Sequence, residues 1–341
     1  MPEGRPTLDT VATAVGVSRM TVSNAYNRPD QLSAATRERI LAVAAELGYP
    51  GPDPTAASLR QRRTGTVGVV LTHRLPYAFT DPGMVSILHG LTTELSDAGL
   101  SLLLLPESST GDGSAVRHAM VDALVLCSLA PEDPAASAAA ERKVPLVTVG
   151  SPRLPKIPTI TVDNHAGAAL AALHLQSLGH SRFGIVTVGP SDEVRPFYRS
   201  VRPDGFAEAL VGIDPDSIEI MTASENSRAA GRAAVAELLA RPARQRPTAI
   251  FAITDILALG VLDAAAGAGV AVPRQLSVVG FDDIAEASTS SPPLTTVHQD
   301  LFEQGRTAAR LILRQLAGES VRAPRFGTAL AVRGSTGAAP R

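Results

Sequence analysis

The sequence lacks the residues and segments on which several classes of protein depend. Its single cysteine, Cys127, excludes an internal disulfide framework and any CxxC metal or redox pair. No apolar run approaches the roughly 18 residues of a membrane helix, and the start of the chain shows no charged-then-apolar secretory pattern. We therefore expect a cytoplasmic protein without membrane contact, in which Cys127 is a buried thiol of the apolar stretch 122–127.

Catalytic signatures are missing as well. The chain has no GxSxG elbow, no HExxH motif and no GxxxxGK(S/T) phosphate loop, and its seven histidines show no metal-ligand spacing. Gly267 and Gly269 form a helix-end turn that lacks the rest of a dinucleotide fingerprint. The sequence therefore predicts neither an enzyme nor a bound metal or cofactor.

Length and charge favour several domains with a mildly basic start. A chain of 341 residues predicts two or three domains of roughly 100 to 200 residues, and 45% hydrophobic content supports their cores. Residues 1–65 carry eight arginines against six acidic residues, whereas residues 66–341 carry an acidic excess of four. Arg60, Arg62 and Arg63 cluster in a stretch that fits either a solvated linker or a set of phosphate contacts.

Residues 7–27 have the pattern of two short helices joined by a tight turn. Thr7 and Ser18 are residue types that cap a helix start, and Gly16 ends the first helix. The apolar positions recur every three or four residues, which places them on one side of each helix. These inward positions are Leu8, Val11, Ala12 and Val15 in the first helix, and Val22, Ala25 and Tyr26 in the second. The pattern predicts a helix-turn-helix.

Polar side chains are left on the outer face of the second helix. In a helix-turn-helix, the start of this helix enters the major groove of DNA, where donors and acceptors read base edges and phosphates. A surface hairpin with a solvated polar face is the alternative. The outward positions are Arg19, Met20, Thr21, Ser23 and Asn24.

Two further helices are expected before residue 65. Ser33 caps a helix over 34–49, whose inward positions are Ile40, Val43, Ala44 and Leu47. Asp53 and Pro54 form a cap and first-turn pair for a short helix over 55–60. Two turns fall well below the ~12 to 15 residues that an isolated helix needs, so this helix requires a partner.

Together these segments resemble the headpiece of the lac-repressor (LacI-type) family of transcriptional regulators. The shared framework of residues 7–27 comprises Thr-Leu, Val-Ala, Gly-Val-Ser, Thr-Val-Ser and the terminal Asn. The resemblance implies that helix 55–60 folds when two copies meet in the minor groove, where Leu59 acts as an apolar wedge. Ala57, where many relatives have arginine, and the stretch 49–52, one residue longer than usual, depart from the family at this hinge. The DNA-binding residues are then Thr7, Ser18, Arg19, Met20, Thr21, Ser23, Asn24, Asn27 and Leu59.

From residue 66 onward, short apolar strands alternate with amphipathic helices. Such continuous apolar strands predict parallel sheets that are covered on both faces. The expected strands are 66–71, 100–105, 122–127, 145–149, 159–162, 182–188, 217–221, 249–253 and 276–281. One helix over 84–99 places Met84, Ile87, Leu88, Leu91 and Leu95 on a single face.

This region resembles the periplasmic-binding-protein-like sensor that forms the second part of the same family. The similarity lies in the segments TVDNHAGA, SLGHSRFGIV, AIFAITDILALGVLDAA, LSVVGFDD and PPLTTVHQD, in that order. The predicted fold is thus an all-α helix-turn-helix headpiece followed by a two-lobed α/β sensor with parallel sheets. The implied domains are a headpiece (1–51), a hinge helix and linker (52–65), an N-terminal lobe (66–162 plus 294–325) and a C-terminal lobe (163–293 plus 326–341).

Ligand-binding residues are expected just after the strands, because ligands bind beyond the carboxyl ends of parallel strands. Carboxylates, an amide and an arginine around an aromatic face suit a sugar first and a nucleoside second. Helix capping or hydrogen bonding between the lobes is the alternative for each aspartate, and Arg202 matches a ligand-contacting arginine of the family. The effector-binding candidates are Phe79, Asp81, Asp163, Asn164, Arg202, Asp255, Asp282 and His298, with Tyr77, Asp283 and Gln299 beside them.

The sequence therefore predicts a ligand-responsive transcriptional repressor. One helix-turn-helix reads only a half-site, so we expect a homodimer on a near-palindromic double-stranded DNA operator. A small molecule, most readily a sugar or sugar derivative, would modulate its affinity. The alternatives are a nucleoside- or purine-responsive regulator of the same type and a non-inducible or architectural DNA-binding protein.

Overall fold

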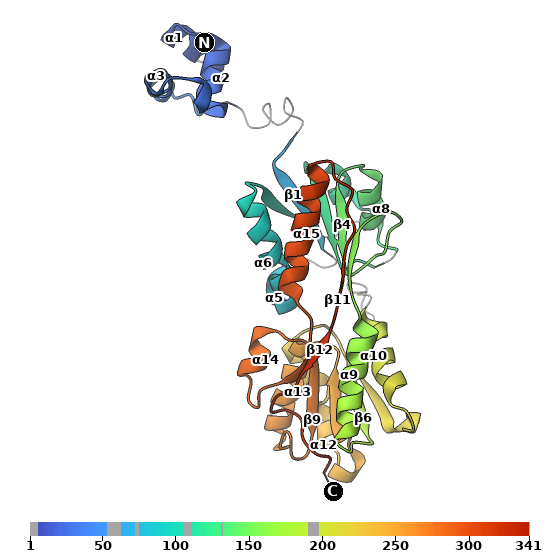
Figure 1. Ribbon diagram of the computed structural model, residues 1–341. Helices are drawn as coiled ribbons and strands as arrows, with labels where there is room; N and C mark the ends of the chain where they lie inside the picture. The colour runs from blue at the N-terminus through green and yellow to red at the C-terminus, as the bar shows by residue number, and fades with distance from the viewer. Residues whose placement is uncertain are drawn as a thin grey trace. The chain divides into compact units, whose positions relative to one another are not determined.

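The chain folds into two compact units, Met1–Thr64 and Gly65–Arg341 (Figure 1). The computed structural model describes residues 6–52, 63–71, 75–105, 111–130, 132–189 and 198–340, apart from the side chains of Tyr77 and 198–200. None of the helices within these ranges is long and apolar enough to cross a membrane. The expected hinge helix over 55–60 falls outside the described residues.

The first unit is a headpiece of three helices. They are α1 (Leu8–Val15), α2 (Arg19–Asn27) and α3 (Ala34–Glu46), with a 3-10 turn, η1 (Pro29–Gln31), before α3. The side-chain oxygens of Thr7, Ser18 and Ser33 accept hydrogen bonds from the backbone N–H three residues later, which confirms the three predicted caps. Gly16 takes a left-handed φ of 74° at the end of α1.

Apolar side chains of all three helices form the core of the headpiece. Val11, Val22 and Ile40 are fully buried, one from each helix. Leu47 was expected to face inward, but it is 39% exposed because the helix ends at Glu46. The predicted inward faces of α1 and α2 are confirmed at Val11, Ala12, Val15, Val22 and Ala25.

The second unit contains two six-stranded sheets, each within one lobe. The first lobe has the strand order β11-β5-β4-β3-β1-β2, with all neighbours parallel. Its strands are β1 (Thr66–Leu71), β2 (Ser101–Leu105), β3 (Ala123–Cys127), β4 (Leu146–Val149), β5 (Thr159–Val162) and β11 (Arg325–Phe326). Its helices are α5 (Tyr77–Thr80), α6 (Pro82–Asp97), α7 (Ser114–His118), α8 (Pro134–Glu141) and α15 (Leu301–Leu316).

The second lobe repeats this plan with the strand order β12-β10-β9-β8-β6-β7, in which only the β10–β12 pair is antiparallel. Its strands are β6 (Phe183–Val188), β7 (Ile218–Ala223), β8 (Ala249–Ala252), β9 (Ser277–Asp282), β10 (Thr295–His298) and β12 (Ala329–Ala331). Its helices are α9 (Asn164–Ser177), α10 (Tyr198–Ala209), α11 (Arg228–Ala234), α12 (Ala236–Ala240), α13 (Asp255–Gly267) and α14 (Ala285–Thr289), with 3-10 turns η2 (Pro215–Ser217) and η3 (Ala243–Gln245).

Both faces of the first sheet are covered, as the continuous apolar strands predict. Ala123, Val125 and Cys127 of β3 belong to a core with α6 and α15, whereas Leu124 and Leu126 belong to a core with α8. Cys127 is fully buried, and burial raises the pKa of its thiol to about 12.

The nine strands expected from the sequence are present, with ends shifted by no more than two residues.

Three passages of chain connect the lobes, after β5, after β10 and between β11 and β12. The return to the first lobe was expected near Leu294, but β10 pairs in parallel with β9 through Thr295 and Val279, within the second sheet. The return therefore follows His298 and leads into α15, which packs on α6. A short strand can be assigned to one sheet or the other only from its pairing partner.

The last described residues, 333–340, lie against the second lobe and contact a buried histidine. His180 is 2% exposed. Its Nδ1 lies 2.9 Å from the hydroxyl of Thr248, and its Nε2 lies 3.0 Å from the hydroxyl of Ser277 and 3.1 Å from the carbonyl oxygen of Gly337. Burial lowers the pKa of His180, so the folded state favours its neutral form.

The contacts of His180 predict a loss of stability in mild acid. The folded pKa is below the unfolded value of about 6.5, so protonation favours the unfolded chain as the pH falls below that value. In urea unfolding followed by circular dichroism, His180→Gln should lose less unfolding free energy than the wild type between about pH 7.5 and pH 5.5. Equal slopes in the wild type and in His180→Gln would refute the role of His180.

Candidate functional site

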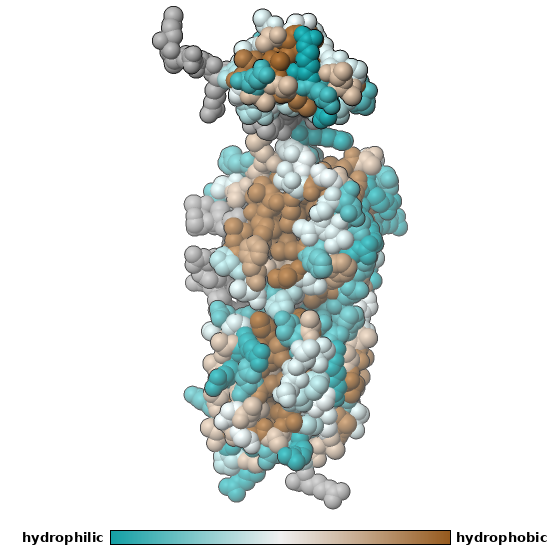
Figure 2. Space-filling view, turned by 90° about the vertical axis from the view of Figure 1, so that its left-hand side faces the viewer, coloured by the Kyte–Doolittle hydropathy of each residue, from teal (hydrophilic) through white to brown (hydrophobic). Residues whose placement is uncertain are grey.

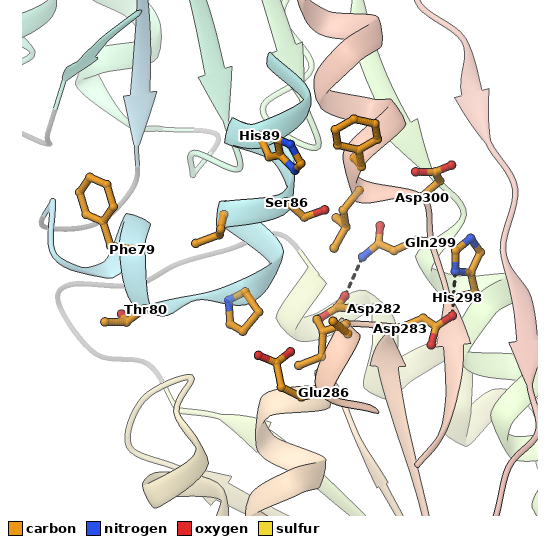
Figure 3. Close-up of a pocket in the computed structure, with 16 residues that line it drawn as sticks. Phe79, Thr80, Ser86, His89, Asp282, Asp283, Glu286, His298, Gln299 and Asp300 are labelled. Atoms are coloured by element: carbon orange, nitrogen blue, oxygen red, sulfur yellow. Dashed lines mark hydrogen bonds and ion pairs between the residues drawn. The ribbon is translucent and has the colours of Figure 1, made fainter. Parts of the chain in front are cut away.

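A cavity of about 680 Å³ lies between the two lobes of the second unit (Figure 3). This interlobe cavity is formed by α5, α6, the end of β9, the start of α14 and the passage from β10 into α15. Its described lining comprises Phe79, Thr80, Pro82, Val85, Ser86, His89, Asp282, Asp283, Ile284, Ala285, Glu286, His298, Gln299, Asp300, Leu301 and Phe302.

The two walls of the interlobe cavity differ in chemistry. Elements of the first lobe contribute mainly apolar and aromatic groups, among them Phe79, which is 67% exposed. Elements of the second lobe contribute Asp282, Asp283 and Glu286 (Figure 3). A ligand placed here would contact a hydrophobic surface on one side and hydrogen-bonding carboxylates on the other.

Asp282 is the central polar group of the cavity. Its Oδ1 accepts a 2.6 Å hydrogen bond from Nε2 of Gln299 and lies 3.2 Å from Nη1 of Arg202. Burial raises its pKa to about 6, although the charge of Arg202 opposes that shift. Asp282 and Asp283 have φ values of 120° and 59°, a strained conformation that is found more often at ligand sites than elsewhere.

Arg202 lies behind Asp282 and is 3% exposed. Its Nη1 donates to the carbonyl oxygen of Ile253 at 2.5 Å, and its Nε donates to Oδ1 of Asn164 at 2.9 Å. The guanidinium is stacked over the ring of Phe281, 3.6 Å from the centroid. Arg202 and Asn164 are thus brought next to Asp282, as expected, but neither is part of the described cavity lining.

Asp255 does not face the interlobe cavity, contrary to the expectation from its place after β8. It is fully buried, and its two oxygens accept hydrogen bonds from the hydroxyl of Thr296 at 2.5 Å and the N–H of Ile284 at 2.9 Å. Burial, with a smaller contribution from the charge of Asp282, raises its pKa to about 7. Its carboxyl group thus joins β10 to the start of α14.

The two remaining aspartate candidates cap helices. Oδ1 of Asp81 accepts from the N–H of Gly83 at the start of α6, and Oδ1 of Asp163 accepts from the N–H of Ala166 at the start of α9. Asp163 also forms an ion pair with Arg325. Asp81 and Asp163 therefore have the helix-capping role that was the alternative to ligand binding. Neither belongs to the described lining of the cavity.

His298 lies at the rim of the cavity and is held by a neighbouring carboxylate. Its Nδ1 lies 3.0 Å from Oδ2 of Asp283, whose other oxygen accepts a 2.6 Å hydrogen bond from Arg333 (Figure 3). The sequence reasoning missed Ser86, His89 and other lining residues of α6 and α15. The helical period that assigned the inward face of α6 places these two residues off that face, which indicates exposure but not a place in a cavity.

The outer face of α2 in the headpiece is polar and exposed. Met20 is 69% exposed, and the side chain of Arg19 is 68% exposed with Asp9 at 3.5 Å. Nδ2 of Asn24 donates to Oε1 of Gln31 at 3.2 Å. Arg19 and Met20 therefore remain available to a ligand, whereas Asn24 is half-buried.

Ser23 differs from the other residues of this face. It was expected to point outward, but it is 8% exposed, and Nδ2 of Asn27 donates to its carbonyl oxygen at 3.1 Å. It lies next to the buried Val22 on the inner side of α2. Thr21 remains on the outer side, where its hydroxyl lies 2.8 Å from that of Ser18, and Leu59 falls outside the described residues.

Comparisons with known proteins agree with both units. A family model described as "Bacterial regulatory proteins, lacI family" matches residues 7–51, and a model described as "Periplasmic binding protein-like domain" matches residues 172–336. The chain is 37% identical over 335 residues to the HTH-type transcriptional regulator IpsA of Corynebacterium glutamicum, covering 92% of both proteins. The chain belongs to the lacI family of bacterial regulatory proteins.

Solved structures of lacI-family regulators share the fold. One is a complex of the transcriptional regulator CelR with cellobiose, 32% identical, with a TM-score of 0.69 over 97% of this chain and 100% of that one. Another is the lac repressor dimer bound to operator and the anti-inducer ONPF, 27% identical, with a TM-score of 0.79 over 97% and 99%. As a lacI-family member, the chain is a DNA-binding transcriptional regulator with a helix-turn-helix and a periplasmic-binding-protein-like domain, and it is not an enzyme.

Proposed function

We propose that this lacI-family protein is a homodimeric repressor whose affinity for a near-palindromic operator is modulated by an uncharged sugar. The observation that carries the proposal is the interlobe cavity, with an apolar wall on one lobe and a carboxylate-rich wall on the other. Sugars have this same division, since their ring faces are apolar and their edges carry hydroxyl groups. The CelR–cellobiose complex supports this ligand class in a related protein.

The charge of the cavity favours a sugar without phosphate. Four carboxylates line it, those of Asp282, Asp283, Glu286 and Asp300. Among its described lining residues there is no lysine or arginine. A phosphate group would therefore meet like charges, whereas hydroxyl groups can donate hydrogen bonds to these oxygens.

The headpiece supplies the DNA contacts in this proposal. The exposed Arg19 and Met20 and the half-buried Thr21 and Asn24 on the outer face of α2 would reach base edges in the major groove, while Thr7 and Ser18 lie at helix starts suited to phosphates. Asn27 and the hinge residue Leu59 complete the proposed contacts, with Leu59 as a minor-groove wedge. Because Ser23 is buried, its proposed role is limited to holding Asn27.

The proposed partner of the second unit is another copy of the chain. Figure 2 shows a broad hydrophobic area on the face of the first lobe that carries α6 and the edge strand β2. On these two elements, Val85 is 43% exposed and Leu103 is 38% exposed. An apolar face of this kind is typical of a protein interface, and the related lac repressor structure is a dimer.

Coupling between sugar and DNA would run through the three passages between the lobes. A sugar held by Asp282, whose carboxylate Arg202 supports from behind, would shift one lobe relative to the other and so alter the two linkers that lead to the headpieces. Such coupling typically changes affinity by about 5 to 150-fold.

The experiment begins with selection of DNA fragments by the purified protein, which should recover a near-palindromic sequence. Release of that fragment is then measured with glucose, ribose and cellobiose, with glucose 6-phosphate and ribose 5-phosphate as matched charged controls, and with cytidine for the nucleoside alternative. At least one uncharged sugar should weaken binding by about fivefold or more, and the phosphates should not. Release by a phosphate ester or by cytidine alone would contradict the sugar assignment, and recovery of no specific sequence would contradict the operator assignment.

A further inference from the structure

Gln304 is a buried polar residue that the interlobe cavity does not account for. It lies on α15 in the first lobe, is 3% exposed, and is not part of the described lining. Burying an amide is unfavourable unless it is hydrogen-bonded. Its partner is therefore informative: Nε2 of Gln304 donates to Oε1 of Gln299 at 3.2 Å.

This hydrogen bond is one step in a chain that crosses between the lobes. Gln299, which is 7% exposed, lies in the passage from β10 to α15 and donates through its own Nε2 to Asp282 at 2.6 Å. Arg202 of α10 contacts the same oxygen of Asp282 at 3.2 Å. The chain thus joins a cavity carboxylate of the second lobe to a helix of the first.

The helix at the end of this chain is closely packed on α6. A Cβ atom added at Gly90 would lie 2.0 Å from the carbonyl oxygen of Phe302, and one added at Gly305 would lie 2.1 Å from that of Ile87. The two backbones therefore touch directly. Farther along the pair, Glu94 of α6 forms ion pairs with two arginines of α15, Arg306 at 2.6 Å and Arg310 at 2.8 Å.

Because backbone contacts leave little room for sliding, a shift of α15 moves α6 with it. Helix α6 carries Val85, Ser86 and His89 on the cavity wall. The series of hydrogen bonds from Asp282 to Gln304 therefore ends on the closely packed pair of helices α15 and α6 rather than on one isolated side chain.

We propose that Gln304 is the positioning residue through which the hydrogen-bonding state of Asp282 is passed to the α15–α6 pair. When Asp282 engages another hydrogen-bond donor, the orientation of Gln299 changes, and Gln304 transfers that change to α15. The inference rests on the proposed function in one respect, the assignment of Asp282 as the residue that senses the sugar. The hydrogen bonds that connect Asp282 to α15 through Gln299 and Gln304 do not depend on that assignment.

The test combines one perturbation with two matched glutamine variants. Asp282→Asn keeps the side-chain shape and replaces a charged acceptor by a weaker neutral one. Gln304→Met keeps volume and removes the amide. Gln315→Met is the control, because Gln315 lies on the same helix but donates to the carbonyl oxygen of Leu146, at 3.4 Å, away from the cavity.

Amide hydrogen exchange of the 299–316 segment, measured by mass spectrometry without DNA or sugar, is the first readout. Asp282→Asn also removes the charged partner of Arg202, which accelerates exchange generally in every background. The relay is therefore measured as the additional acceleration at the start of α15, which should appear in the wild-type and Gln315→Met backgrounds and be absent in the Gln304→Met background. An equal additional effect of Asp282→Asn in both glutamine variants, or none in any protein, would overturn the proposal.

Affinity for the selected DNA fragment, measured by fluorescence anisotropy at fixed salt, is the second readout. Asp282→Asn should change it by about fivefold or more in the wild type and in Gln315→Met, and by less than about twofold in Gln304→Met. Equal factors in the two glutamine variants would again overturn the relay. If no protein binds a specific fragment, the operator assignment fails, while the exchange measurement still decides the role of Gln304.

Discussion

Arg202→Met is expected to lower the free energy of unfolding of the sensor unit by about 3 to 5 kcal/mol. The substitution removes a buried guanidinium, 3% exposed, and leaves Asp282 without its cationic partner. It also leaves Oδ1 of Asn164 and the carbonyl oxygen of Ile253 without a donor. Urea unfolding followed by circular dichroism gives the measurement.

Arg228→Met is a matched control for this variant. Arg228 forms an equally direct ion pair with Asp263, at 2.6 Å, but the two side chains are 54% and 38% exposed. Exposed pairs contribute about 0 to 1 kcal/mol, because water solvates both charges and salt screens them. A similar cost for both arginines would show that burial of the Arg202–Asp282 pair is not what makes it important.

The double variant Arg19→Ala/Asn24→Ala is expected to lower specific operator affinity by about 100-fold or more, since each good base contact contributes about 1 to 3 kcal/mol. Arg19 is exposed, and Asn24, which is half-buried, donates one hydrogen bond to Gln31. Thermal unfolding should therefore change much less than operator affinity. Glu38→Gln, an exposed change on α3, should remain within about twofold of the wild type.

Nonspecific binding distinguishes base reading from general attraction. Phosphate contacts are sequence-independent and salt-sensitive, so the double variant should retain most of its affinity for unrelated DNA apart from the contribution of one arginine charge. Equal losses on operator and unrelated DNA would contradict a base-reading role for this face of α2.

Features set by local sequence could be predicted well. The helix caps could be predicted because each one needs only a hydroxyl and the backbone N–H three residues later, which are close in the sequence. The capping residues are Thr7, Ser18 and Ser33. The strands were found because their apolar runs are continuous, which follows from burial on both faces. Neither inference needs to know what the segment packs against.

Features that depend on tertiary pairing could not be predicted. Asp255 comes just after β8 and Asp282 ends β9, and only the packing of β10 and α14 against Asp255 determines that it is buried whereas Asp282 borders the cavity. Ser23 is polar, like the residues of the outer face of α2, yet its position on the helix places its side chain beside the core. The chain from Asp282 through Gln299 to Gln304 joins residues whose separation in the sequence gives no sign of contact.

If the interlobe cavity and the headpiece are coupled, the coupling must be reciprocal. Operator affinity is measured with and without a saturating amount of the sugar that releases the selected fragment, and sugar affinity is measured with and without saturating operator. Both ratios should be equal, between about 5 and 150. If each ligand binds with the same affinity whether or not the other is present, the cavity does not control DNA binding, and the proposed coupling does not exist.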